Sequence, residues 1–349
     1  MMTESPSLPV NLDALATWMD TQGLEQGPIA DAALLTGGTQ NILLRFRRGA
    51  RDFVLRRPPR HLRANSNETM RREARVLGAL AGSDVPHPGL IAACPDETVL
   101  GAAFYLMEPI DGFNPMVGLP QLHASNPAIR RQMGFAMIDG LLALSRIDHI
   151  AVGLSDLGKT AGYLERQVPR WRAQLESYRE FAHWPGAAAI PGVDIVANWL
   201  SANQPAAFTP GLIHGDYHVA NVMFRHDAPR LAAIIDWELT TIGDPLIDLG
   251  WLLATWVDTA HPCAAELRIE PADGLPDATE LIAYYAAHSQ RDLAAVNWYA
   301  VLACYKLGII LEGSWARACA GKATQETGLR LHAQTIGLFE RALTWIDQR

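Results

Sequence analysis

One stretch of the sequence gathers polar residues at the ends of short apolar segments. It reads GLIHGDYHVANVMF from Gly211, continues through a polar turn over 225–230, and ends as LAAIID at Asp236. If 222–224 and 231–235 pair as a hairpin around that turn, Asn221 and Asp236 fall opposite each other at its open end. Amide and carboxylate oxygens placed side by side suit Mg²⁺. The pattern therefore predicts a magnesium site at Asn221 and Asp236.

A further carboxylate, Asp216, precedes Asn221 by five residues on a predicted loop. From that loop it can orient a hydroxyl group and accept its proton without binding metal. His214 and His218 have the spacing of a zinc pair, but Gly215 and the β-type flanks disfavour a helix, and no Glu follows His214 as in H-E-x-x-H. We therefore expect His214 to hold the loop by hydrogen bonding.

The elements that position these residues form two unequal lobes. With 349 residues, 49% of them hydrophobic, the chain can bury a large core. Apolar alternation predicts strands over 42–47 and 53–56, which make a small antiparallel meander, and a further strand over 104–107. A helix is expected over 69–81, with Glu73 on its apolar, inward face.

The rest of the chain is dominated by helical patterns. They cover 129–147, 160–181, 246–257, 279–288, 294–319 and 324–346. The Pro and Gly of 108–112 favour a connector between lobes. We therefore predict an α+β fold with an N-terminal lobe over 1–107, a hinge over 108–112 and a mostly helical lobe over 113–349.

Three ordered motifs carry a family resemblance. They are H-G-D-x-x-x-x-N at 214–221, I-D-W-E at 235–238 and G-D-P-x-x-D-L at 243–249. Together they resemble the aminoglycoside phosphotransferase family, which has a protein-kinase-like fold. The resemblance implies transfer of a phosphoryl group from ATP, with two Mg²⁺ ions, to a hydroxyl of a small molecule.

The resemblance also implies roles for individual residues. Asp216 matches the catalytic base, Asn221 and Asp236 match the metal ligands, and Glu73 matches the glutamate of the N-lobe helix. The turn at Gly37, Gly38 and Thr39 matches the flap over the phosphates. Asp248 would brace the catalytic loop through backbone N–H groups, its alternative being a solvent-facing helix acid. Asp244 is expected to cap the helix that Pro245 begins, and Glu238 either assists a metal ion or is a surface charge.

One position departs from the family pattern, because the first 158 residues contain no lysine to contact the α- and β-phosphates. Arg56 is the expected replacement, since a guanidinium can grip phosphate oxygens in bidentate fashion. Strand alternation puts Val54 on the same face, where it would touch the adenine, and turns Arg57 to the other face. In the connector, Met107 would lie behind the adenine, with a carbonyl near Glu108 and the N–H of Ile110 as purine contacts, because Pro109 has no N–H to offer.

The acceptor is left open between two chemical classes. The acidic helical lobe would attract a polycationic aminoglycoside. The motifs VLRRPP and IIDWELTTIGDPLIDL, however, resemble the kinase-like domains attached to some acyl-CoA dehydrogenases, which act on hydroxyacyl-CoA, and Arg57, Arg60 and Arg63 would then meet CoA phosphates. The alternative function is a nucleotide-binding protein without catalysis, a pseudokinase suggested by the missing lysine.

Charge and composition exclude other classes. The window Arg45 to Arg75 carries a net charge of +8 and the remainder −16, but no base-stacking aromatic run accompanies it, so nucleic acid is not an expected partner. No apolar run is long enough for a membrane span, and the N-terminal segment lacks a secretory pattern, so we expect a cytoplasmic protein. The four cysteines show no paired spacing and are expected to be reduced core residues. Trp251, Trp256, Trp298 and Trp315 are likewise expected in the core.

Overall fold

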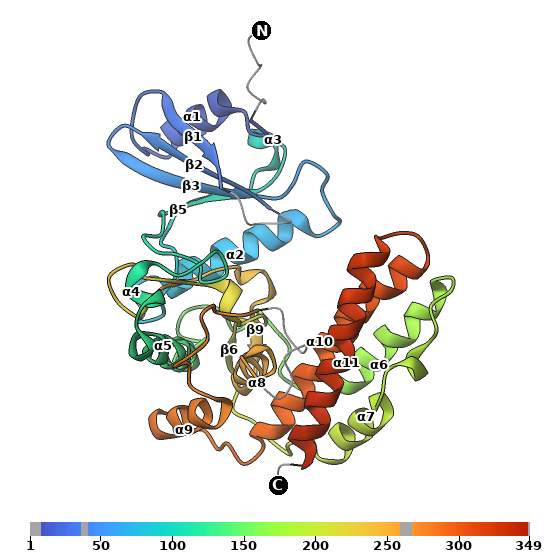
Figure 1. Ribbon diagram of the computed structural model, residues 1–349. Helices are drawn as coiled ribbons and strands as arrows, with labels where there is room; N and C mark the ends of the chain where they lie inside the picture. Colours follow the sequence, from blue (N-terminus) through green and yellow to red (C-terminus); the bar gives the residue numbers. More distant parts are fainter. Residues whose placement is uncertain (1–7, 36–40, 259–266, 348–349) are drawn as a thin grey trace. The chain divides into compact units, whose positions relative to one another are not determined.

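The structure is a computed structural model that describes residues 8–35, 41–258 and 267–347. The chain divides into two compact units, shown in Figure 1. The first comprises Met1–Asp111 and Ala233–Glu238, and the second comprises Gly112–Ala232 and Leu239–Arg349.

The first unit is built on a five-stranded antiparallel sheet with the strand order β1-β2-β3-β5-β4. The strands are β1 (Ile29–Leu34), β2 (Ile42–Arg48), β3 (Arg51–Arg57), β4 (Leu90–Cys94) and β5 (Phe104–Met107). Its helices are α1 (Leu12–Thr21), α2 (Ser66–Leu80) and α3 (Glu97–Leu100). The antiparallel pairing predicted for β2 and β3 and the further strand predicted at β5 are confirmed, whereas β1 and β4 were not expected.

The two faces of β3 have different neighbours. Phe53 and Leu55 belong to a core cluster that also contains Leu15 and Met19 of α1. Residue 56 lies on the opposite face, as alternation along a strand requires, and its side chain reaches Glu73 of α2. The helix expected over 69–81 is present, begins three residues earlier, and buries Glu73 to 1% exposure.

The second unit is mostly helical. Its helices are α4 (Gln121–Ala124), α5 (Pro127–Ser145), α6 (Gln167–Ser177), α7 (Val193–Ala202), α8 (Leu246–Thr255), α9 (Ala278–His288), α10 (Val296–Cys319) and α11 (Gln325–Asp347). The long helices α10 and α11 pack against each other, and α8 packs against α10 (Figure 1). The α+β, protein-kinase-like class expected from the sequence is confirmed.

One predicted helix is considerably shorter than expected. Apolar periodicity suggested a helix over 160–181, but α6 begins only at Gln167. Gly162 has a φ of 62°, in the left-handed region that an α-helix does not contain. The segment before Gln167 therefore forms turns, which carry the chain into the helix.

Short strands frame the H-G-D-x-x-x-x-N motif. They are β6 (Gly211–Ile213), β7 (Val222–Phe224), β8 (Leu231–Ile234) and β9 (Thr241–Gly243). β6 pairs antiparallel with β9, and β7 pairs with β8 as the predicted hairpin. After the connector, Phe113 exchanges both backbone hydrogen bonds with Phe224 of β7 at 2.8 Å. Gly112 is needed there because a Cβ atom at this position would lie 2.6 Å from the Phe224 carbonyl oxygen.

Three of the four tryptophans expected in the core are buried. Trp251, Trp256 and Trp298 are buried, whereas Trp315 is half-buried. Cys94, Cys304 and Cys319 are free thiols; the fourth cysteine lies outside the described residues. Within the parts of the chain that the structure describes, no helix combines the length and apolar character needed to cross a bilayer.

Candidate functional site

The loop that follows β6 is fastened to the start of helix α8. Asp248, in the first turn of α8, is 1% exposed, so it is not a solvent-facing acid. Its two carboxylate oxygens accept the backbone N–H groups of His214 at 2.6 Å and Gly215 at 2.8 Å. The loop is therefore held by a single buried carboxylate whose two oxygens are both engaged.

Gly215 is required by the shape of this loop. Its φ is 87°, a conformation that residues with a side chain rarely adopt. A Cβ atom here would also lie 2.6 Å from the carbonyl oxygen of Leu239. The glycine therefore lets the loop turn tightly against the chain and bring the next residue, Asp216, into position.

Asp216 is held by two neighbours on the same loop. The Nδ2 of Asn221 donates to the Asp216 carbonyl oxygen at 3.0 Å and to its Oδ2 at 3.1 Å. The Nε2 of His218 lies 3.3 Å from Oδ1. His214 Nδ1 in turn accepts the Asp216 N–H at 3.3 Å. The carboxylate is fixed from both sides, while 29% of its side chain remains exposed.

The pKa values of Asp216 and Asp248 are shifted in opposite directions. Burial favours a raised pKa for Asp216, but the hydrogen bond and charge of His218, helped by His214 and Lys306, outweigh it and lower the pKa. Burial raises the pKa of Asp248 to about 6, even though the N–H groups of Gly215 and His214 oppose the shift. Asp216 is therefore the more readily ionised acid, as a proton acceptor should be.

A second acidic residue lies just before α8. Asp244 was expected as the N-cap with Pro245 as the first helical residue, but α8 begins at Leu246 with Pro245 as its N-cap, one residue later. The buried carboxylate of Asp244 still accepts the N–H of Leu246 at 3.0 Å. It also accepts a short hydrogen bond from the Tyr299 hydroxyl of α10. Asp244 therefore has a structural role at the start of α8.

In the first unit, Arg56 lies between two carboxylates. Its Nε is 2.8 Å from Glu73 Oε2, and its Nη2 is 2.6 Å from Asp236 Oδ1. The Tyr105 hydroxyl donates to Glu73 at 2.7 Å, because β3–β5 pairing sets Tyr105 opposite Arg56. Burial works to lower the pKa of Arg56, but Glu73, Tyr105 and Asp236 overcome it and raise the pKa. The guanidinium therefore stays charged.

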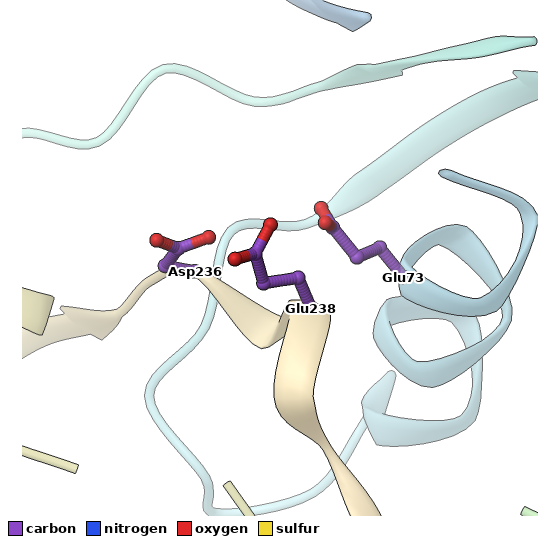
Figure 2. Close-up of side chains that lie close together, drawn as sticks. All are labelled: Glu73, Asp236 and Glu238. Atoms are coloured by element: carbon purple, nitrogen blue, oxygen red, sulfur yellow. The ribbon is translucent and has the colours of Figure 1, made fainter. Parts of the chain in front are cut away.

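The acids around Arg56 form a cluster with metal-ligating chemistry. Oxygens of Glu73, Asp236 and Glu238 lie within 4.8 Å of one another, and Figure 2 shows the three carboxylates gathered from α2 and from the turn after β8. Asp236 has a φ of 67°, a left-handed conformation that Asp tolerates better than most residues. Its Oδ1 is occupied by Arg56, and Glu238 is half-buried beside it.

The expected adenine contacts lie together at the end of β5. Val54 and Met107 are cross-strand partners, so their side chains are neighbours on the sheet. The Glu108 N–H donates to the Gly89 carbonyl at 2.8 Å, and the Glu108 side chain pairs with Arg51 at 3.0 Å. Among the described residues, the N–H of Ile110 finds no acceptor, which leaves it available to a ligand.

The expected flap cannot be compared with the structure, and one of the arginines expected to meet CoA phosphates is buried. The flap residues Gly37, Gly38 and Thr39 lie outside the described residues. Arg57 was expected to be available to CoA phosphates, and this is wrong, because it is 6% exposed and its Nη1 lies 3.5 Å from the carbonyl oxygen of Pro9. Alternation does turn it away from Arg56, but that face is packed against the chain. Arg60 and Arg63 are exposed.

Sequence reasoning missed three residues of these sites. His218 was weighed only as a zinc ligand, although its spacing from Asp216 also permits a contact within one loop. Tyr105 can be found from register, since it faces Arg56 across two adjacent strands. Lys306, which donates to the Gly215 carbonyl at 3.3 Å, is 91 residues away in sequence and gives no local signal.

Comparison with known proteins decides the family. The model of the phosphotransferase enzyme family, APH, matches residues 31–297. The chain belongs to this family. The H-G-D-x-x-x-x-N motif, Glu73 and the connector over 108–112 all fall inside the matched segment.

Two similar curated proteins are considerably longer than this chain. Human acyl-CoA dehydrogenase family member 11 is 30% identical over 93% of this chain, and mouse acyl-CoA dehydrogenase family member 10 is 28% identical over 87%. The chain spans only 42% and 28% of these two proteins.

Solved structures support the same assignment. A protein from Ralstonia eutropha JMP134, assigned to the aminoglycoside phosphotransferases, is 30% identical with a TM-score of 0.78, covering 96% of this chain and 99% of its own. The GDP complex of aminoglycoside 2'-phosphotransferase-IIIa is 14% identical with a TM-score of 0.60, over 96% of this chain and 99% of its own. The latter likeness shows the shared fold.

Proposed function

We propose that the protein transfers the γ-phosphoryl group of ATP to a hydroxyl of a small molecule. The bond between the γ-phosphorus and the bridging oxygen of ADP breaks, and a new bond forms to the acceptor oxygen. Asp216 accepts the proton that the hydroxyl loses. The products are ADP, the phosphorylated acceptor and a proton.

The observation that carries this proposal is the environment of Asp216. Its carboxylate is oriented by Asn221 and His218, its pKa is lowered, and its loop is braced by Asp248. A carboxylate that is fixed, ionised and partly exposed can align a hydroxyl and take its proton.

Residues of the first unit are proposed to bind the nucleotide. Val54, Met107, Glu108 and Ile110 would receive the adenine, with a hinge at 108–112, and Gly37, Gly38 and Thr39 would cover the phosphates. Arg56, oriented by Glu73, would contact phosphate oxygens. The nucleotide complexes of fold relatives, such as the one with GDP, support a nucleotide as phosphate donor.

The donor set also fits magnesium. The Oδ1 of Asn221 accepts no hydrogen bond from the described residues, since that side chain donates through Nδ2, and Asp236 retains one oxygen that Arg56 does not contact. These are hard oxygen ligands of the kind Mg²⁺ prefers. Asn221 and Asp236 would hold the metal, and bound Mg²⁺ would neutralise phosphate charge.

For the acceptor, we favour a hydroxyacyl-CoA over an aminoglycoside. The curated relatives of this chain are named as acyl-CoA dehydrogenases, and the similarity to them extends over most of the chain. The structural relative from Ralstonia eutropha keeps the aminoglycoside alternative open. ADP formation measured against a panel of both acceptor classes separates them.

A nucleotide-binding protein without catalysis remains the second candidate. It is favoured by one observation, the arginine at the position where the family has lysine, which here is tied to both Glu73 and Asp236. Nucleotide protection in a thermal-shift assay, combined with no ADP formed across the whole panel, would support this candidate.

The deciding experiment substitutes the proposed base. We expect Asp216→Asn to reduce kcat by about 10²–10⁴-fold, because the hydroxyl then lacks a proton acceptor. Asp227→Asn is the matched control, since Asp227 lies in the same unit, is 67% exposed and pairs with its near neighbour Arg225. Equal turnover of Asp216→Asn and the control would reject the assigned role.

A further inference from the structure

Lys306 is a cation with no assigned role in the proposed phosphotransfer. It lies on α10, and its Nζ donates to the carbonyl oxygen of Gly215, one residue before the proposed base. The loop from His214 to Asn221 contains no lysine or arginine of its own. The lysine that contacts this loop therefore comes from a helix that is distant in sequence.

Among the residues that the structure describes, none forms an ion pair with Lys306. Its Nζ lies 4.3 Å from the centre of the Trp251 ring and 5.7 Å from that of Trp171. Over the described ranges, no carboxylate oxygen lies within 4.0 Å of Nζ. The indole N–H groups of Trp171 and Trp251 also have no acceptor in the described chain. The neighbourhood is thus rich in donors and poor in acceptors.

The nearby acids are engaged elsewhere. Asp248 uses both oxygens for backbone N–H groups, and Asp216 is held by Asn221 and His218. Burial lowers the pKa of Lys306, although the more distant charges of Asp216 and Asp248 oppose this. A cation removed from water is costly unless an anion reaches it. An anionic ligand would remove that cost.

We propose that Lys306 binds a phosphate-type anion beside Asp216. The inference rests on the proposed function, since the anion is either the phosphoryl group in transfer or a phosphate carried by the acceptor. An ammonium with three donors on a flexible stem suits phosphate oxygens, whose arrangement varies during a reaction. Gly215 anchors the stem, and the aromatic faces stabilise the charge when no anion is bound.

The scarcity of lysine allows a direct test on the unmodified protein. The chain has three lysines, Lys159, Lys306 and Lys322, so labelling with [ε-13C]lysine gives three NMR signals. Lys159→Met and Lys322→Met assign two of them, and the third belongs to Lys306. We expect inorganic phosphate to shift the Lys306 signal in a saturable manner. An unmoved Lys306 signal, or equal shifts of all three, would overturn the proposal.

Substitution then identifies the source of the anion. Lys306→Met removes the charge, Lys306→Arg keeps it, and Lys322→Met is the control, because Lys322 lies 5.3 Å from the Phe181 ring but is exposed. A fall in kcat of Lys306→Met with every acceptor indicates the transferred phosphoryl group. A rise in KM confined to phosphate-bearing acceptors indicates the acceptor. Wild-type kcat and KM in Lys306→Met would contradict both.

The two proposals fail in different ways. If no acceptor yields ADP but phosphate still shifts the Lys306 signal, phosphotransfer fails while the anion site stands. If Asp216→Asn abolishes turnover and phosphate leaves Lys306 unmoved, the anion site fails while phosphotransfer stands. Since the NMR measurement uses the wild-type side chain, instability of Lys306→Met does not affect it.

Discussion

Arg56 shows how one substitution within a family motif changes the balance of charges. A guanidinium reaches Glu73 and Asp236 at once, through Nε and Nη2. A lysine ammonium is a single point charge and has no fixed fork with which to span them. The arginine therefore makes a buried network in which each member depends on the others.

We expect Arg56→Met to lower the free energy of unfolding by about 3–5 kcal/mol, because two carboxylates then lose the cation between them. Chemical denaturation provides the measurement. Adding Glu73→Gln should recover part of the loss by removing one of the unpaired charges.

The matched control is Arg45→Met. Arg45 also pairs with an acid, Asp52, but the two side chains are 53% and 39% exposed, so the loss should be at most about 1 kcal/mol. Similar losses for Arg56→Met and Arg45→Met would show that burial of the network is energetically unimportant.

Asp248 is expected to set the acid limit of activity. Its pKa of about 6 means that it takes up a proton as the pH falls, while Asp216, whose pKa is lowered, stays ionised. A protonated Asp248 no longer accepts both loop N–H groups equally well. We therefore expect kcat/KM to fall with an apparent pKa near 6, as measured by a pH–rate profile.

The sign for stability is opposite to that for activity. The folded state holds this proton more tightly than the unfolded state, so the contribution of Asp248 to the free energy of unfolding increases as the pH falls through its folded pKa. Asp248→Asn should have lower kcat/KM at every pH and no acid limb from this group. An unchanged limb in that variant would assign it to another residue.

At the scale of elements, the site depends on how closely α8 approaches α10. A Cβ atom at Gly250 would come closer to the Tyr299 carbonyl oxygen than real Cβ atoms do. Tyr299 also donates to Asp244, just before α8. The contact between the two helices therefore holds the helix that carries Asp248.

We expect Gly250→Ala to reduce the free energy of unfolding by about 1–3 kcal/mol, because the backbones must separate to admit the methyl group. Thermal and chemical denaturation measure the loss. Gly78→Ala on α2 is the control, since its nearest neighbour is the flexible end of Leu90 at 3.4 Å.

Gly78→Ala should be neutral or stabilising by up to about 1 kcal/mol, because alanine favours a helix interior more than glycine does. If Gly250→Ala were also neutral or stabilising, the close approach of the α8 and α10 backbones at Gly250 would not matter to stability.

At the scale of the whole molecule, the basic window of the sequence does not act as an isolated patch of positive charge. Several of its arginines pair with acids, and most of these acids come from outside the window. Besides the Arg56 network, the pairs include Arg45–Asp52, Arg47–Asp31, Arg48–Asp20, Arg51–Glu108 and Arg71–Glu97. Charge that is concentrated along the sequence is thus offset in space.

We accordingly expect no measurable affinity for duplex DNA at about 0.15 M salt, since a phosphate backbone would have to displace these acids. Fluorescence anisotropy with a labelled duplex checks this. Asp31→Asn combined with Asp52→Asn releases two arginines and should bind more at low salt. Micromolar binding by the wild type, with a steep salt dependence, would contradict the expectation.

The sequence by itself determined the features that depend on neighbours along the chain. The order of H-G-D-x-x-x-x-N and I-D-W-E indicated the family, helical periodicity turned Glu73 inward, and strand alternation separated Arg56 from Arg57. The conclusions about Glu73, Arg56 and Arg57 follow from repeats of 3.6 and 2 residues, which are local properties of the backbone. Periodicity alone did not reveal the positive φ of Gly162, so it predicted a helix that begins before Gln167, where α6 begins.

Only the tertiary structure decided which distant groups pair. Arg56 meets Asp236 across 180 residues, and Lys306 meets Gly215 across 91. No spacing rule encodes such pairs, because they depend on how sheets and helices pack rather than on the path of the chain. The burial of Arg57 against Pro9 and the raised pKa of Asp248 have the same origin, since both come from surroundings that the packed fold supplies.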